Sequence, residues 1–521
     1  MLKKYLLSCF ICLFLVSFTL TGCGQQASST SEGQQAEQVL VVGARDFVRT
    51  LDNGFLLVEK THIAETLLTM DENYRIQPVL ATSWKQVEDN VWEFTLREGV
   101  RFHDGAPLTA ADAAYAIERV VNANPRVKGL TKITSVMAAG DQTLRITTGE
   151  LNLLLPEALT GADLCILSRE SFNEKGELTR PIGTGPFKFT SWDQATGEVI
   201  VEKNFNYWGA VPRLSKMVFK PIPDANTRAL ALEKGEIDFT FDLPYGELDR
   251  LNKVPGVKVA LYPEPRIYRL ELNMTREPFN DLRVRQALNH AIDRTGIVKN
   301  VLHDCGTATI GPFVQDAPWC NREVEGSYSY DPDKARSLLT EAGWVDKNGD
   351  GIREKDGKPF AITIMTWSSR PGMPPMAEAL QAQFREIGID AKVQILEYGT
   401  IYDNVKKGNW DTVLASFQTS DPHKYLASVY GSNGSQNVAK YVNDEVDALI
   451  DQAARTAVPE KRYAIYRQVQ EIITRDTPVI NIACYKMAVG MRDYVKGFKF
   501  NPNAHDLHTN PGMYVEKRVE R

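Results

Sequence analysis

The sequence predicts an α/β protein with open, twisted, mixed sheets that is divided into at least two domains. Short strand-like runs alternate with helical runs along most of the chain. The chain has 521 residues, whereas a single hydrophobic core stops growing at about 250 to 300 residues. The order of elements does not follow the regular pattern of a barrel, and no internal repeat is evident.

The first region extends from Val39 to about Tyr262. Its strand-like runs are rich in β-branched and aromatic residues, and they cover residues 39–42, 92–96 and 143–147. Helices are expected between them at residues 110–121 and 227–234.

A second α/β region begins near Arg266. Residues 268–272 alternate like a strand, and a helix is expected from Leu282. One face of that helix is apolar, formed by Val284, Ala287, Leu288, Ala291 and Ile292. Further along, residues 335–342 predict a helix that Gly343 ends, and residues 360–366 and 374–387 predict a strand followed by a helix.

The amino terminus has the order of a signal peptide. Lys3 and Lys4 precede an apolar run at residues 6–20, and Leu20-Thr21-Gly22-Cys23 follows. This segment resembles a bacterial lipoprotein signal, so we expect residues 1–22 to be removed and Cys23 to carry lipid. Residues 23–37 contain no large apolar side chain and are expected to form a flexible linker. The alternative is an uncleaved anchor helix, and both interpretations place the protein outside the cytoplasm, at the bacterial cell membrane.

The charge and cysteine content limit the partners and the redox chemistry. There are 60 basic and 66 acidic residues, a net charge of -6, and no long basic run, which argues against a nucleic-acid partner. Outside the cytoplasm the four cysteines after Cys23 can form disulfides, and a Cys305–Cys320 bond is predicted because it would close a short loop. Cys165 and Cys484 lie in apolar stretches and are expected to be buried.

Ordered motifs across nearly the whole mature chain resemble family 5 solute-binding proteins, the peptide and nickel receptors of ABC importers. The matching segments are residues 78–84, 92–105, 182–186, 206–209, 283–288 and 330–344. The resemblance implies a two-lobed fold of the periplasmic-binding-protein type (class II, cluster C) that closes by a hinge. It places lobe I at residues 38–264 plus 488–521 and lobe II at residues 265–487, with crossings near Pro265 and Met487. It also implies a monomeric receptor that meets an ABC permease and its ATPase.

The expected ligand follows from single positions within that resemblance. Peptide receptors of the family place an Asp four residues before a Pro, where it pairs with the peptide amino terminus, but the position before Pro422 is Gln418. An unpaired buried ammonium would be costly, so a peptide ligand is disfavoured, although Asp421 could serve instead. Short peptides therefore remain the alternative ligand.

Nickel receptors of the family resemble the chain more closely over several segments, and they bind the metal within a small carboxylate-bearing chelator such as histidine. Arg126 falls on an arginine position that faces the chelator, and His505 falls on a ligand-contacting position. His508 could join His505 on one metal ion if the segment were helical. Trp367 and Arg370 end a predicted strand and are candidates for the cleft. Tyr402, Phe417 and Gln418 complete the candidate ligand contacts.

Four family positions depart from the nickel pattern and leave the chelator chemistry open: Asp163, Gly129, Ser420 and Gly434. No nucleophile or catalytic triad occurs at recognisable spacing, so the chain is not expected to be an enzyme or to hold an intrinsic cofactor. The segment from Asp346 imitates the start of a calcium loop, but its twelfth position is Gly357 in place of the bidentate Glu, which favours a surface hairpin.

Overall fold

The computed structural model describes residues 37–516, which form one compact unit. The predicted signal peptide, Cys23 and all of the linker except Glu37 lie outside the described residues. Within the described part, no helix is long and apolar enough to span a membrane.

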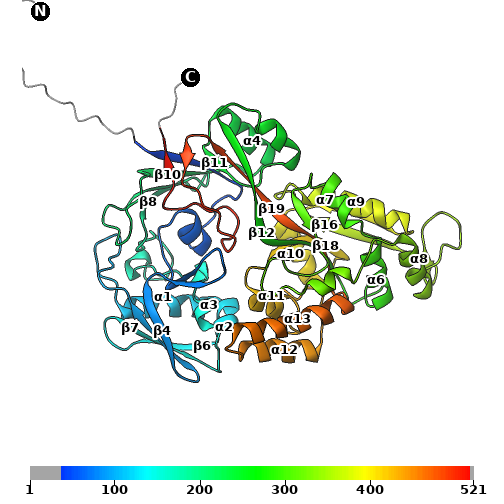
Figure 1. Ribbon diagram of the computed structural model, residues 1–521, viewed down its shortest axis with the longest axis horizontal. Coiled ribbons are helices and arrows are strands. Elements are labelled where there is room, and N and C mark those ends of the chain that lie inside the picture. Colours follow the sequence, from blue (N-terminus) through cyan, green and yellow to red (C-terminus); the bar gives the residue numbers. More distant parts are fainter. Residues whose placement is uncertain (1–36, 517–521) are drawn as a thin grey trace, which may run out of the picture. The chain divides into compact units, whose positions relative to one another are not determined.

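A mixed 11-stranded sheet runs through the unit in the order β17-β16-β18-β12-β19-β11-β1-β10-β9-β8, and β13 pairs with β19 (Figure 1). Its strands are β1 (Val39–Ala44), β8 (Phe187–Trp192), β9 (Val199–Lys203), β10 (Lys216–Pro221), β11 (Phe239–Thr240), β12 (Val257–Leu272), β13 (Gly306–Ala308), β16 (Ala361–Thr366), β17 (Asp390–Ile395), β18 (Thr412–Gln418) and β19 (Val479–Arg492). The largest hydrophobic cluster follows this sheet from Leu40 to Val515.

The two longest strands, β12 and β19, pair antiparallel and connect the two halves of the sheet. The first part of β12 lies opposite the end of β19, which β11 also joins, whereas the last part of β12 pairs with β18. The pairing is irregular between Pro263 and Ile267, and Met487 lies opposite Tyr262. Pro265 therefore lies within the irregular part of this pair of strands and Met487 lies just outside it, and the lobe boundaries at these two positions stay a prediction.

A separate sheet with the order β4-β5-β7-β6 has a core of its own. Its strands are β4 (Ala81–Glu88), β5 (Val91–Leu96), β6 (Ile133–Ala138) and β7 (Thr143–Thr148), and its helices are α1 (Ala110–Ala123), α2 (Pro125–Thr131) and α3 (Leu155–Ala158). Thr109 caps α1 in a capping box with Asp112, and the apolar face of α1 packs into this core. We call residues 67–166 the four-stranded subdomain.

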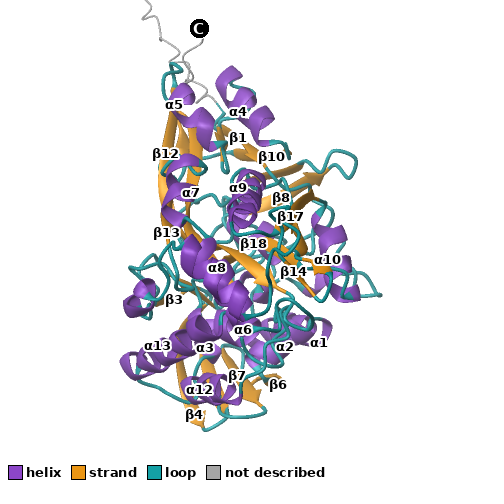
Figure 2. Cartoon of the chain, turned by 90° about the vertical axis from the view of Figure 1, so that its right-hand side faces the viewer, coloured by secondary structure: helices purple, strands orange, loops and turns teal. Residues whose placement is uncertain are grey.

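The second half of the chain is rich in helices, as Figure 2 shows. They are α6 (Leu282–Ala291), α7 (Arg294–Asn300), α8 (Pro332–Glu341), α9 (Met373–Glu386), α10 (Tyr398–Lys407), α11 (Pro422–Val429), α12 (Asp444–Ala454) and α13 (Pro459–Asp476). Helices α11 to α13 and residues 313–320 share a third core, whose buried aromatic residues include Phe313, Trp319, Tyr425 and Tyr466. We call residues 313–320 and 422–479 the helical subdomain.

The remaining elements are short. Helices α4 (Ala225–Lys234) and α5 (Leu248–Leu251) precede β12, and a π-helical segment covers Phe55–Lys60. Single 3-10 turns occur at Ala162–Leu164, Arg169–Ser171, Tyr245–Glu247 and Arg322–Gly326. Two-stranded pairs join β2 (Leu68–Met70) to β3 (Ile76–Pro78), β14 (Glu354–Lys355) to β15 (Lys358–Pro359), and β20 (Val495–Lys496) to β21 (Tyr514–Val515).

The predicted strands and helices are confirmed, and most of their boundaries shift by a few residues. The exception is the strand predicted at residues 268–272, which begins at Val257. The predicted Cys305–Cys320 disulfide is wrong for this structure, in which both side chains are free thiols. The physical reason is that Cys305 is buried in the core of the large sheet, whereas Cys320 is buried in the helical subdomain. Cys165 and Cys484 are buried, as expected.

Candidate functional site

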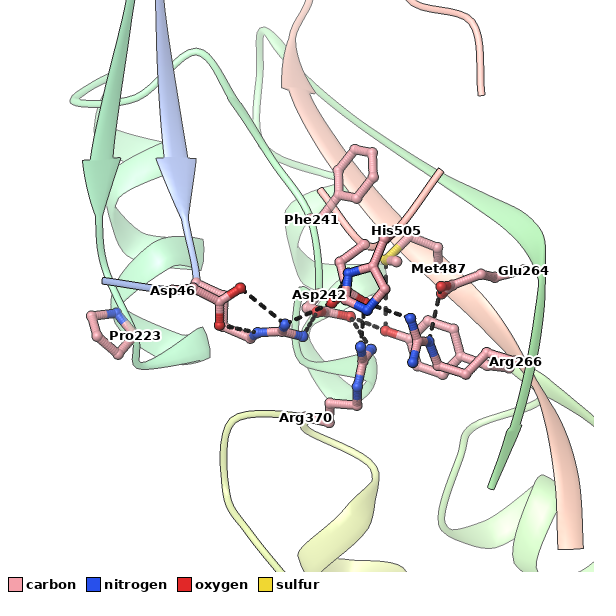
Figure 3. A network of polar contacts seen from close by, with 12 residues as sticks. Asp46, Pro223, Phe241, Asp242, Glu264, Arg266, Arg370, Met487 and His505 are labelled. Carbon is pink, nitrogen blue, oxygen red and sulfur yellow. Dashed lines mark hydrogen bonds and ion pairs between the residues drawn. The ribbon is translucent and has the colours of Figure 1, made fainter. Parts of the chain in front are cut away.

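A buried ionic network surrounds Asp506, in the segment that returns after β19. Figure 3 shows Asp242, Glu264, Arg266, Arg370 and His505 of this network. Its carboxylate accepts hydrogen bonds from Arg45 Nη2 at 2.9 Å, from Arg266 Nη2 at 2.8 Å and from Arg370 Nη2. Asp242 pairs with Arg45 at 2.9 Å and accepts a hydrogen bond from Tyr485. Glu264 pairs with Arg266 at 2.9 Å. Three cations from distant parts of the chain thus share one carboxylate.

Strand ends bring these groups together. Arg45 directly follows β1, Asp242 lies just after β11, and Arg370 lies beyond the end of β16. Glu264 and Arg266 lie within the irregular part of β12, between Pro263 and Ile267. In α/β folds, ligand sites form beyond the ends of strands, so the network marks the region where a site is expected.

The neighbouring charges and burial determine which carboxyl groups of the network are ionised. Burial by itself would raise the pKa of Asp506, but Arg266, Arg370, His505 and Arg45 hold it well below its usual range. Burial raises the pKa of Glu264, against the opposing effect of Arg266. Arg370 Nη1 and Glu264 Oε2 are buried and have no hydrogen-bond partner among the described residues. Asp506 is therefore the ionised centre of the network.

His505 lies beside the network with its ring accessible. The ring stacks on Phe55 with centroids 4.4 Å apart, and its Nδ1 lies 3.2 Å from Asp506 Oδ2. The side chain remains 41% exposed, although burial lowers its pKa to about 4. Its backbone N–H donates to Glu59 at 2.7 Å, and burial raises the pKa of that carboxyl to about 8. His505 therefore presents a neutral imidazole that is partly accessible to solvent.

Gln418 reaches the same return segment from the end of β18. Its Nε2 donates to the carbonyl oxygen of Ala504 at 2.8 Å, and it lies 3.3 Å from that of Pro502 and 3.4 Å from that of Asn503. The amide is thus held by backbone carbonyls, in the position where peptide receptors carry a carboxylate.

The predicted aromatic contacts lie near the ends of β16 and β18. Trp367 is half-buried and packs edge-on against Tyr398, at a centroid distance of 5.3 Å. Tyr402 is 50% exposed one turn further along α10. Phe417 packs against Tyr425 and against the buried guanidinium of Arg269. Trp367 and Tyr402 remain open to solvent, whereas Phe417 belongs to the packing around Arg269.

Arg126 is not joined to this group by any contact that the structure records. It lies in the first turn of α2 and pairs with Asp163 at 2.6 Å, with 39% of its side chain exposed. The resemblance to nickel receptors implies a second arginine at position 163. This chain has Asp163 there, and its carboxylate pairs with Arg126.

His508 does not accompany His505 as a metal ligand, which corrects the expected pair. Its ring is 2% exposed. Asn501 N–H donates to its Nε2 at 3.0 Å, and its Nδ1 lies 3.1 Å from the backbone oxygen of Asp506. Both ring nitrogens are thus occupied. Among residues 37–516, no group of three or more His, Cys, Asp and Glu side chains could hold a metal ion.

Several sequence motifs behind the family resemblance meet at a buried carboxylate, Glu65, instead of at the network. Glu65 accepts hydrogen bonds from Thr184 at 2.7 Å, Tyr207 at 2.7 Å and Trp208 at 2.9 Å. Arg97 lies over the Trp208 ring at 4.4 Å. These motifs therefore stabilise the fold around Glu65.

Sequence reasoning missed Arg45, Asp242, Arg266 and Asp506. The available signal was the presence of single charged residues within or beside apolar strand runs, such as Asp242 after residues 239–241 and Arg266 before residues 267–272. Buried charges are almost always paired, so each of these charged residues indicated an oppositely charged partner elsewhere in the chain.

Comparison with known proteins identifies the family. Residues 75–437 match the bacterial extracellular solute-binding proteins, family 5 Middle. The chain belongs to this family. Its fold is accordingly the two-lobed fold of family 5 binding proteins, which are transport receptors.

Relatives with different ligands are similarly close. The oligopeptide-binding protein AppA of Bacillus subtilis is 28% identical over 99% of this chain and 99% of its own length. The nickel-binding periplasmic protein of Escherichia coli is 29% identical, over 85% of this chain and 88% of its own. The crystal structure of NikZ from Campylobacter jejuni in complex with Ni(L-His) superposes with a TM-score of 0.77 at 26% identity, covering 90% of this chain and 96% of that one.

Proposed function

We propose that this family 5 receptor captures nickel, or a similar transition metal, as a complex with a small chelator such as histidine, for delivery to an ABC permease and its ATPase. The observation that carries the proposal is the amide of Gln418, which is engaged by backbone carbonyls where a peptide amino terminus would need a carboxylate. We also propose that lipid on Cys23 tethers the receptor to the bacterial cell membrane, outside the cytoplasm.

The accessible imidazole of His505 supports a metal complex. A neutral imidazole is a good ligand for nickel, and burial keeps this ring neutral at physiological pH. The described residues supply no complete set of metal ligands, so a chelator would provide the rest. Arg126 would meet a chelator carboxylate only by releasing Asp163, and the buried Arg370 only by releasing Asp506. The half-buried Trp367 needs no such release and is the better placed candidate for the chelator.

The alternative is a short-peptide receptor, which the AppA relative favours. In that case a carboxylate at a position other than 418 would pair with the amino terminus of the peptide. Asp421 caps α11 by accepting from Lys424 N–H at 2.9 Å, so it would have to serve both roles.

Isothermal titration calorimetry of the mature protein separates the two ligands. We expect saturable binding of nickel with L-histidine, weaker binding of nickel alone, and none of a set of di- to pentapeptides. His505→Ala should weaken nickel–histidine binding by about tenfold or more, the effect of losing one metal contact. His290→Ala, on the surface of α6, is the matched control. Saturable peptide binding without a response to the metal would contradict the proposal.

A further inference from the structure

The four-stranded and helical subdomains meet along a seam of three side-chain pairs. Glu157 Oε1 in α3 lies 2.8 Å from Arg462 Nη2 in α13. Glu150 and Arg455 lie 3.9 Å apart, and the rings of Tyr74 and Trp319 pack edge-on at 4.9 Å. In both ionic pairs the carboxylate comes from the four-stranded side and the arginine from the helical side.

The three pairs differ in strength because they differ in exposure. Glu150 and Arg455 are 50% and 59% exposed, so solvent screens their attraction. Arg462 is only 8% exposed, and its Nη1 donates to the carbonyl oxygen of Thr456 at 3.2 Å, which fixes the guanidinium in place. Glu157 is 30% exposed. The Glu157–Arg462 pair is therefore the main ionic contact of the seam.

The Glu157–Arg462 pair joins two subdomains that are far apart in the sequence. Glu157 and Arg462 are 305 residues apart in sequence. In Figure 1, α2 and α3 lie beside α12 and α13, below the crossing of β12 and β19. Any movement about the crossing strands that separates the subdomains must break this pair.

We propose that Glu157 and Arg462 form a latch that holds the subdomains together in the closed form and sets how long a captured solute is retained. They are positioning residues, because they act through closure and do not contact the solute. The latch does not depend on whether the solute is a metal complex or a peptide. Breaking it leaves a partly buried charge on each side, whereas restoring opposite charges in reversed order should restore closure.

Small-angle X-ray scattering of the mature protein without added solute tests the latch. We expect Glu157→Gln and Arg462→Met each to increase the radius of gyration, and Glu157→Arg combined with Arg462→Glu to return it toward the wild-type value. Lys461→Met, an exposed cation on the same helix, should leave it unchanged. Circular dichroism and melting temperature establish that each variant is folded.

Stopped-flow release of nickel–histidine gives a second readout. We expect each single variant to release the complex about tenfold faster, which corresponds to the loss of about 1.4 kcal/mol of closure free energy. Folded single variants with wild-type scattering, or a charge-reversed pair no more compact than the single variants, would overturn the latch. Failure of nickel–histidine to bind the wild type would contradict only the proposed ligand, because the scattering result stands without it.

Discussion

At the scale of single residues, Asp506 has the largest structural role in the candidate site. Arg45, Arg266 and Arg370 all donate to it. Arg266 and Arg370 are each 4% exposed, and the side chain of Arg45 is 12% exposed. Buried cations are costly without a partner, so Asp506, together with Asp242 and Glu264, compensates for these three charges. His505 depends on the same carboxylate for its orientation.

Asp506→Asn should therefore lower the free energy of unfolding by about 3–5 kcal/mol, because it removes the one carboxylate that Arg45, Arg266 and Arg370 share. Asp46→Asn, at a carboxylate that is 51% exposed, should cost less than about 1 kcal/mol. Chemical denaturation at pH 7 measures both. The native pKa of Asp506 is lowered, so its contribution is present above its unfolded pKa of about 4 and fades as the pH falls further. A constant difference between wild type and variant down to pH 2 would contradict this account.

At the scale of elements, the turn Gly183-Thr184-Gly185-Pro186 shows why a motif can be structural. A Cβ atom on Gly185 would lie 2.1 Å from the carbonyl oxygen of His62, and Gly185 N–H donates to Ile63 at 3.0 Å. The glycines let this turn approach the backbone at residues 62–64, and Thr184 then reaches Glu65. The motif therefore joins two segments of the first region.

Gly185→Ala should destabilise the protein by about 1–3 kcal/mol, since the backbone must shift to admit the methyl group. Gly129→Ala is the matched control, because no atom lies within 4 Å of its added Cβ and the residue is in helix α2. That change should be neutral or stabilising by up to about 1 kcal/mol. Thermal unfolding compares them, and equal effects would show that close approach is not the reason for the glycine.

At the scale of the whole molecule, three large cores follow different parts of the chain. One follows the 11-stranded sheet, one fills the four-stranded subdomain and one fills the helical subdomain. Separate cores unfold as separate cooperative units. The seam between the two subdomains contributes a few polar pairs and one aromatic contact, so it couples the cores weakly.

Hydrogen–deuterium exchange should reveal this independence. Phe94 is fully buried in the four-stranded core, so Phe94→Ala should cost about 3–5 kcal/mol there. We expect faster exchange in β4 to β7 and unchanged protection in β12 and β19, the central strands of the large sheet. A uniform rise in exchange across the chain would mean that the cores unfold together.

Features that depend on neighbouring residues in the sequence could be predicted, whereas contacts between side chains in the folded protein could not. The helix at residues 282–291 and the strand at residues 268–272 were predictable because their periodicity is local. The disulfide and the His505–His508 metal pair were not, because nearness in sequence was taken for nearness of side chains. Cys305 and Cys320 belong to different cores, and the His508 ring turns inward to bond the backbone.

The sequence by itself determined the α/β class, the order of elements and the family, because alternating patterns and ordered motifs are written along the chain. Only the tertiary structure decided that residues 45, 266, 370 and 506 form one network, and that Arg126 meets Asp163. The physical reason is that a buried charge pairs with whichever opposite charge lies next to it in the folded chain. The spacing of residues in the sequence does not show which strand ends will be adjacent.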